Sequence, residues 1–401
     1  MFSNRPIHLP TSSIYRIAVG CFYFMQGLVF ASWASRIPDI QNKLSLNPAA
    51  LGGLLLVIPM GQMTAMWLSG MGVARFGSRR MVLCAAILYP LILVTLGMAS
   101  SFFTLSVGLF FFGMAGNLYN IAVNTQGVGV ERLYVGKSIM ARFHGLWSIA
   151  GFIGGLISTW MVARDLDPET HFRMIFIFCM VLVAVTFRFT LPRDPKQRKE
   201  TEAIAPLAKK RNFKIPERNI LLLGCIAFGS MACEGTMFDW SAVYFEKVIN
   251  PGRDLIRVGY IAYMCAMAGG RFAADSLITK FGAVKILKFS GIIIFAGLLL
   301  AVLQPTLVPA TIGFLLVGFG TSSIIPICYS LAGRSKTMRP GPAIAAVSTV
   351  GFLGFLLGPP LIGFIAQVSS LKWSFSVIAM IGLMTSILAP MVLKSKKPID
   401  S

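Results

Sequence analysis

Twelve apolar runs, each about the length needed to cross a membrane, dominate this 401-residue sequence. A helix takes about 20 residues to cross a hydrocarbon core of ~30 Å. Only 13% of the residues are charged, against roughly 25% in a soluble domain. The sequence therefore predicts an all-α polytopic membrane protein and excludes a soluble enzyme, a disordered chain and a collagen-like fibre. The twelve expected transmembrane helices cover residues 14–34, 51–72, 81–99, 102–126, 140–162, 172–191, 219–245, 257–276, 284–303, 307–331, 343–367 and 373–393.

The spans divide into two sets of six, separated by the only long polar segment. This division predicts an N-terminal six-helix bundle over residues 1–191, a cytoplasmic linker over 192–218 and a C-terminal six-helix bundle over 219–401. The halves also repeat, because Gly113 and Asn117 recur as Gly318 and Ser322 at an offset of 205 residues. Transporters are commonly built from such repeats, with the solute site at the repeat interface near mid-membrane.

The net charge of +21 has two interpretations. On a soluble protein it would indicate nucleic-acid binding, whereas in a membrane protein basic loops record topology. Of the 36 basic residues, 27 lie on the side of the termini, eight on the other side and one within a span. We therefore expect both termini in the cytoplasm, a multi-pass protein of the cell inner membrane, and no nucleic-acid partner. The seven cysteines and three histidines show no metal-ligand spacing, so we expect no metal and no cofactor.

The turns after the second and eighth spans carry a repeated motif. Its first copy is Gly70, Arg75, Gly77, Arg79 and Arg80, with Ala74 at the position where an acid is usual. Its second copy is Arg271, Asp275, Lys280 and Gly282. These residues resemble the loop signature of the major facilitator superfamily, in which the motif forms a charged gate. The absence of the acid at Ala74 places any charge latch in the second copy.

Several segments resemble more narrowly the YbjJ/MosC-like branch, near the fucose permeases. They are Ala31–Pro38, Ala122–Asn124, His144–Gly145, Glu234–Gly235, Asp239–Trp240 and Gly358–Pro360. The resemblance covers nearly the whole chain. It implies two six-helix bundles with pseudo-twofold symmetry, solute transport, and a cavity lined by the first, fourth, seventh and tenth spans.

Two acids, Glu234 and Asp239, are placed well inside an expected span. An ionisable group within a bilayer is a functional candidate by default. We expect Glu234 to couple protons, the alternative being a carboxylate that fixes helix packing. Asp239 is a second candidate, placed nearer the periplasmic mouth, where an exposed acid at a helix end is ordinary. His144 is either a proton relay or a residue of the cytoplasmic gate.

Polar and aromatic side chains on particular helix faces are the candidate solute contacts. Asn117, Asn120 and Asn124 share one face because their spacing follows the helical period. Amides and aromatic faces suit sugar-like solutes, and the alternative for each residue is helix packing. The remaining candidates are Tyr23, Gln26, Phe30, Trp33, Trp147 and Ser322.

These features favour a secondary active transporter that works by alternating access. The expected mode is proton-coupled symport of a small polar, sugar-like solute, driven by the proton gradient, by a monomer in the lipid bilayer. The alternative is a proton-coupled exporter of drugs or metabolites. A membrane-embedded enzyme is disfavoured, because the chain carries no HExxH motif and no GxSxG motif.

Overall fold

The computed structural model describes residues 11–134, 139–192, 217–335, 338 and 340–393, and over these residues the chain is helical apart from its connecting turns. The N-terminal half contains α1 (Thr11–Ser35), α2 (Ile37–Lys43), α3 (Pro48–Phe76), α4 (Ser78–Met98), α5 (Phe102–Glu131), α6 (Met140–Val162) and α7 (Pro168–Thr186). The C-terminal half contains α8 (Arg218–Tyr244), a π-helical turn (Phe245–Ile249), α9 (Val258–Phe281), α10 (Ala283–Leu303), α11 (Leu307–Thr321), α12 (Ile324–Gly333), α13 (Pro340–Val368) and α14 (Leu371–Leu393). The predicted linker, residues 192–218, lies almost entirely outside the described residues.

Eleven helical segments among the described residues are long and apolar enough to cross a membrane. Helix α9 is the twelfth, since its 24 residues extend about 36 Å and it packs against α6 and α11. Its charged residues are Arg271, Asp275 and Lys280. The predicted all-α fold with twelve transmembrane helices is therefore confirmed.

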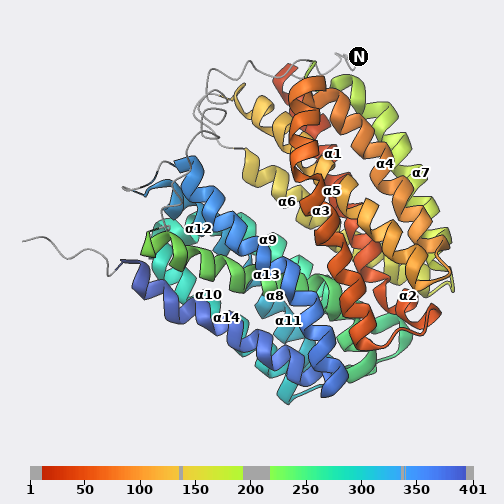
Figure 1. Cartoon of the computed structure of the whole chain (residues 1–401), viewed down its shortest axis with the longest axis vertical. Helices are drawn as coiled ribbons and strands as arrows, with labels where there is room; N and C mark the ends of the chain where they lie inside the picture. The colour runs from red at the N-terminus through yellow and green to blue at the C-terminus, as the bar shows by residue number, and fades with distance from the viewer. Residues whose placement is uncertain (1–10, 135–138, 193–216, 336–337, 339, 394–401) are drawn as a thin grey trace, which may run out of the picture.

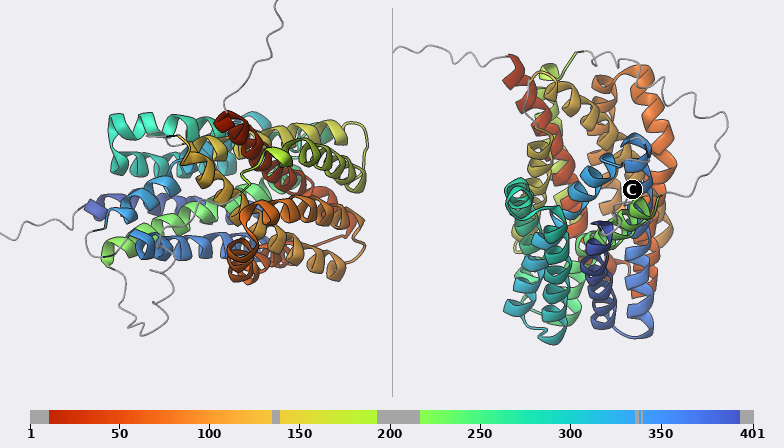
Figure 2. Two further views of the ribbon diagram at one scale, coloured as in Figure 1. Left: turned by 90° about the horizontal axis from the view of Figure 1, so that it is seen from above. Right: turned by 90° about the vertical axis from the view of Figure 1, so that its left-hand side faces the viewer.

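Figure 1 shows the two halves as two bundles, the first red to yellow-green and the second green to blue. The turned views in Figure 2 show the helices of each bundle running side by side. We call the end of the molecule that carries Gly77 and Gly282 the motif end, and the end that carries Asp39 and Arg257 the distal end. The repeat partners Gly77 and Gly282 each end a helix with a positive φ, 83° and 82°, so the two halves turn alike at the motif end.

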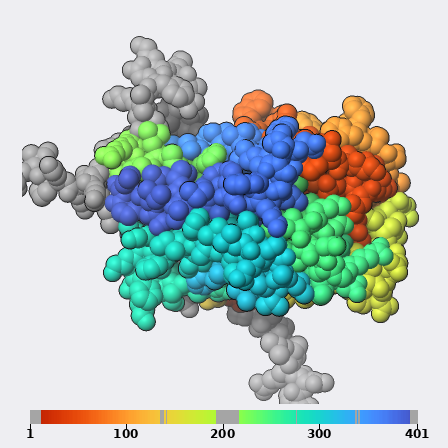
Figure 3. Space-filling view, turned by 90° about the horizontal axis from the view of Figure 1, so that it is seen from below, coloured from red at the N-terminus to blue at the C-terminus, as the bar shows by residue number. Residues whose placement is uncertain are grey.

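The two halves pack together toward the distal end. There α3 contacts α13, and α6 contacts α9. A Cβ added to Gly363 would lie 2.5 Å from the Pro48 carbonyl oxygen, so the absence of a side chain lets the α3 and α13 backbones touch. Figure 3 shows the two halves meeting along a continuous seam on this face.

Two features of the fold differ from the sequence prediction. The short helix α2 follows α1 directly and was not expected. The expected span 307–331 is split into α11 and α12 at Ser322 and Ser323. Here the Ser322 hydroxyl donates to the Phe319 carbonyl at 2.7 Å, and Pro326 has no N–H to donate to Ser322, so the helical ladder is interrupted.

Repeat-related glycines hold neighbouring helices close in both halves. A Cβ on Gly113 of α5 would lie 2.1 Å from the Ile58 carbonyl oxygen of α3. A Cβ on Gly318 of α11 would lie 2.2 Å from the Tyr263 carbonyl oxygen of α9. Both the glycines and their partners are 205 residues apart, so the same contact is built twice.

We expect Gly113→Ala to destabilise the protein, because the new methyl group would overlap backbone that cannot yield without moving a helix. Overpacking of this kind costs about 1–3 kcal/mol. Gly53→Ala is the matched control, since nothing lies within 4 Å of its added Cβ. Thermal unfolding in detergent should show a melting temperature several degrees lower for the first variant than for the second. Equal melting temperatures would contradict the packing argument.

Candidate functional site

A charged pair lies between the halves, at the middle of the helices. The Arg271 Nη2 of α9 donates to the Glu234 Oε1 of α8 at 3.2 Å, and its Nη1 donates to the Ser148 Oγ of α6 at 2.7 Å. Both charged side chains are partly buried, with 13% of Glu234 and 23% of Arg271 exposed. Arg271, which the repeat pattern assigns to the loop motif, instead joins Glu234 to the other half. The side chain of Asp275 is outside the described residues, so the predicted latch between Arg271 and Asp275 stays a prediction.

An aromatic cluster lies beside Arg271 of this pair. The Arg271 guanidinium lies 5.9 Å from the Trp147 ring centroid. Trp147 packs against Phe30 at 5.9 Å and Phe238 at 5.9 Å, and Phe30 meets Phe238 at 5.3 Å. The cluster combines α1 and α6 of the first half with α8 of the second, so it is an interface between the halves.

A polar group extends from this cluster toward the motif end. The Tyr23 hydroxyl donates to the Asn124 Oδ1 at 2.8 Å, and the Asn124 Nδ2 donates to the Asn120 Oδ1 at 2.9 Å. The Tyr23 ring meets the edge of His144 with 5.4 Å between centroids. Asn120 and His144 are exposed. The predicted amide face therefore forms a hydrogen-bonded row with Tyr23.

Four other candidates are not joined to the row of Tyr23, Asn124 and Asn120 by a hydrogen bond between described side chains. Trp33 is 1% exposed and packs within the first half against Phe112, so it does not belong to the face shared by Tyr23 and Phe30. Asn117 has a buried Oδ1 with no partner among the described residues. Gln26 is buried. Ser322 is buried with its hydroxyl bound to Phe319 of its own helix.

Asp239 is buried rather than exposed at a helix end. The π-helical turn extends the seventh span to Ile249, which places Asp239 about 15 Å inside that end. Within the described part of the chain, no cation lies at ion-pair distance from it, whereas Glu234 has Arg271.

The loop motif adopts the same geometry in both halves. The Arg75 guanidinium lies over the Phe76 ring at 5.4 Å, and the repeat partner Lys280 lies over Phe281 at 5.3 Å. Arg79 lies over the Phe187 ring at 5.0 Å. Gly70 and Arg80 are exposed. None of Arg75, Arg79 and Arg80 forms an ion pair with a described side chain, in line with the missing acid at Ala74.

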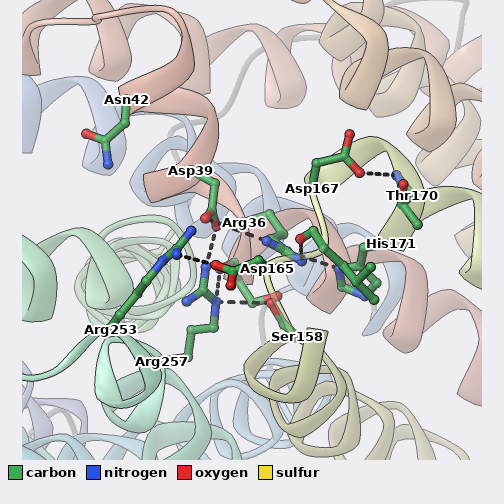
Figure 4. Close-up of polar contacts among 12 residues, drawn as sticks. Arg36, Asp39, Asn42, Ser158, Asp165, Asp167, Thr170, His171, Arg253 and Arg257 are labelled. Atoms are coloured by element: carbon green, nitrogen blue, oxygen red, sulfur yellow. Dashed lines mark hydrogen bonds and ion pairs between the residues drawn. The ribbon is translucent and has the colours of Figure 1, made fainter. Parts of the chain in front are cut away.

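A second charged group, the distal cluster, closes the distal end (Figure 4). It consists of Arg36, Asp39, Ser158, His171 and Arg257, of which only Arg257 comes from the second half. Arg257 donates through Nε to the Ser35 carbonyl at 3.0 Å and to the Ser158 Oγ at 3.1 Å, and through Nη2 to Asp39. Both arginines are 1% exposed. One carboxylate thus holds a buried arginine from each half.

Arg36 completes the distal cluster from the first half. Its Nε donates to the His171 Nδ1 at 3.2 Å, its Nη2 to the Leu166 carbonyl at 2.8 Å, and its Nη1 lies 3.6 Å from Asp39. Burial lowers the pKa of Arg36 to about 10, with Asp39 opposing the shift and the Arg257 charge adding to it. Arg36 is therefore still protonated at neutral pH, and the cluster keeps two positive charges for one carboxylate.

Exposed contacts surround the distal cluster. Arg253 pairs with Asp165 at 2.5 Å, and Asn42 donates to Glu246 at 2.7 Å and accepts from Lys247 at 2.9 Å. Each of these contacts joins one half to the other. The distal end is therefore held by polar contacts as well as by the packing of α3 on α13.

Two six-helix bundles built from a repeat, with a charged pair between them, define the class of helical membrane transporters. The sequence profile of the Major Facilitator Superfamily matches residues 17–340 and 261–401. An uncharacterized MFS-type transporter of Yersinia pestis is 33% identical over 359 residues, which cover 90% of this chain and 91% of that one. Membrane protein MosC of Rhizobium meliloti is 29% identical over 377 residues, 94% of this chain and 90% of its own. A solved D-xylose–proton symporter superposes with a TM-score of 0.74 at 14% identity, covering 95% of this chain and 98% of that one.

The chain therefore belongs to the Major Facilitator Superfamily and is a multi-pass membrane transporter for small solutes. Its relatives are transporters rather than enzymes, as the sequence predicted. The predicted resemblance to MosC is confirmed as well.

Proposed function

We propose that the protein is a proton-coupled symporter of a small polar, sugar-like solute that works by alternating access. The observation that carries the proposal is the Glu234–Arg271 pair, held between the halves by Ser148. Charges within membrane spans are costly and mark solute or proton pathways. The Glu234 carboxylate can take a proton when Arg271 no longer pairs with it. Because Arg271 also binds Ser148 of the other half, proton binding at Glu234 is then linked to a change in the contact between the halves.

The arrangement of the halves supports alternating access. The charged contacts of the distal cluster hold the distal end together, while Asn120 and His144 are exposed nearer the motif end. If both termini are cytoplasmic, as the basic residues predict, this is the inward-facing state. The protein is then an inner-membrane protein, and the proton gradient, rather than a cofactor, supplies the energy for transport.

Roles follow from position. Glu234 takes the proton, with His144 as relay between Glu234 and the cytoplasm and Asp239 as the second candidate acid. Asn120, Asn124 and Tyr23 bind solute hydroxyls, while Phe30 and Trp147 pack against the solute body. A sugar–proton symporter with the same fold supports this class of solute. We propose that one chain, without a partner subunit, completes the cycle.

The test is solute-driven proton movement in proteoliposomes that contain a pH-sensitive dye. Sugars, polyols, amino sugars and organic acids are first screened by thermal shift. We expect external addition of a stabilising solute, with no imposed gradient, to acidify the lumen, because symport carries protons inward with the solute. Alkalinisation would instead support the proton-coupled exporter, and an unchanged pH during solute uptake would contradict proton coupling.

A further inference from the structure

The Arg271 guanidinium has more donors than the protein supplies with acceptors. Arginine carries five N–H donors, and the structure engages Nη1 with Ser148 and Nη2 with Glu234. The other donors have no acceptor among the described residues. The Arg271 side chain is 23% exposed where it meets α6, and the proposed function places the solute there. A planar guanidinium group with free N–H donors matches a carboxylate, because it can donate two parallel hydrogen bonds to the two carboxylate oxygens.

The charge balance of the site also favours a solute that bears a carboxylate. Glu234 is the only described carboxylate within ion-pair distance of Arg271. If Glu234 takes a proton, as the proposed function requires, the positive charge of Arg271 has no partner among the described side chains. Removing one partner of a buried pair is strongly unfavourable. A solute carboxylate restores neutrality, so protonation of Glu234 and binding of an anion favour each other.

We propose that the transported solute bears a carboxylate, and that Arg271 is its binding residue. The neighbouring residues indicate which other chemical groups the solute carries. The hydrogen-bonded row of Tyr23, Asn124 and Asn120 offers partners for hydroxyl groups, and Trp147 and Phe30 offer an apolar wall. The class is therefore a small hydroxylated carboxylate, such as a sugar acid. A cationic solute is disfavoured because a protonated Glu234 cannot bind it and Arg271 repels it.

The other titratable groups with described side chains near the pair lie on α6, α9 and α12, and the side chain of Asp275 on α9 is outside the described residues. Tyr263 of α9 and Tyr329 of α12 lie near enough to Glu234 to feel its charge, and His144 of α6 feels that of Arg271. None of these replaces Glu234 as a permanent anion at neutral pH. The proton taken up with the solute is therefore assigned to Glu234.

The test uses matched pairs of solutes that differ only in charge. Purified protein is titrated with D-glucuronate and D-glucuronamide, and with benzoate and benzamide, in a thermal-shift assay at pH 6 and pH 8. We expect at least one carboxylate to stabilise the wild type while its amide does not. Its affinity should fall by about tenfold per pH unit once Glu234 is ionised, since one proton binds with each solute.

Two variants separate the roles of the pair. Glu234→Gln should bind the carboxylate at pH 8 as tightly as the wild type binds it at low pH, with no remaining pH dependence. The double variant Arg271→Gln with Glu234→Gln keeps the site neutral and should fold, yet lose carboxylate binding by at least tenfold. The proposal is overturned if no carboxylate is preferred over its amide, or if the double variant binds the carboxylate as the wild type does.

This proposal rests on the proposed function, but the two can fail separately. A carboxylate that binds through Arg271 and crosses the membrane without protons would overturn proton coupling and leave the anion site standing. If instead a neutral sugar is carried with protons and carboxylates do not bind, the anion site is overturned and proton coupling stands. Dye-loaded proteoliposomes distinguish these outcomes.

Discussion

Glu234→Gln should abolish accumulation of solute against its gradient and leave downhill exchange of solute nearly unchanged. Glutamine has the shape of the protonated acid but cannot release a proton. The transporter then moves solute in both directions with no link to the proton gradient. With an inward gradient of one pH unit, symport of one proton supports about a tenfold accumulation ratio, since one pH unit is worth 1.36 kcal/mol. We expect this ratio to fall to about one in proteoliposomes.

Asp239→Asn is the matched control, because the change is the same and both residues lie on α8. Asp239 has no described cation at ion-pair distance, in contrast to Glu234. We therefore expect this variant to keep accumulation. If Asp239→Asn loses accumulation of solute while Glu234→Gln keeps it, proton coupling is assigned to Asp239 instead.

Much of this fold could be predicted from the sequence because a bilayer imposes a simple rule. Apolar runs of about 20 residues must cross it as helices, so eleven of the twelve spans each contain one α-helix as expected, and the 205-residue offset reappears in the contacts of Gly113 and Gly318. Local departures from the rule were not predictable in the same way. The interruption at Ser322 depends on a hydroxyl bonding to its own helix and on Pro326, and α2 is too short to give a periodic signal.

The candidate site was predictable residue by residue but not as an arrangement. Glu234 was found because an acid inside a span is rare. Its partner Arg271 was visible as the one basic residue left within a span, but only helix rotation decides whether it faces a loop acid or Glu234. The periodicity of Trp33 likewise matches that of Tyr23, but only the structure shows that its ring packs against Phe112. Arg36 and Arg257 were counted as topology markers, since their shared partner Asp39 is more than 200 residues from Arg257.

Helices α6 and α9 carry both charged groups that join the halves. Arg271 of α9 binds Ser148, and Arg257, the residue before α9, binds Ser158, so two arginines meet two serines of α6 at two depths. Between them the helices touch through small residues, since a Cβ on Gly151 would lie 2.1 Å from the Met264 side chain. Movement of α9 relative to α6 would therefore change the contacts of Arg271 and those of Arg257 together. In the proposed function, this links the Glu234 site to the distal cluster, as alternating access requires.

Asp39→Asn should open the distal end. Its carboxylate is the shared partner of Arg36 and Arg257, which are both buried in the closed arrangement and repel each other. An uncompensated buried charge costs about 3–5 kcal/mol, and separating the halves returns Arg257 to water. A bias of that size shifts the balance between closed and open states by roughly 10²–10⁴-fold. Spin labels at the exposed residues Ala163 and Asp254, one in each half, should report a longer distance in lipid nanodiscs.

Asp165→Asn is the matched control for that experiment. It removes a carboxylate from the same end and breaks its pair with Arg253, but the side chains are 77% and 66% exposed. An exposed pair contributes only about 0–1 kcal/mol, so the label distance should stay that of the wild type. The two variants thus compare a buried and an exposed ion pair across the same interface. If Asp39→Asn also keeps the wild-type distance, the distal cluster does not hold the halves together, and closure must come from the packing of α3 on α13.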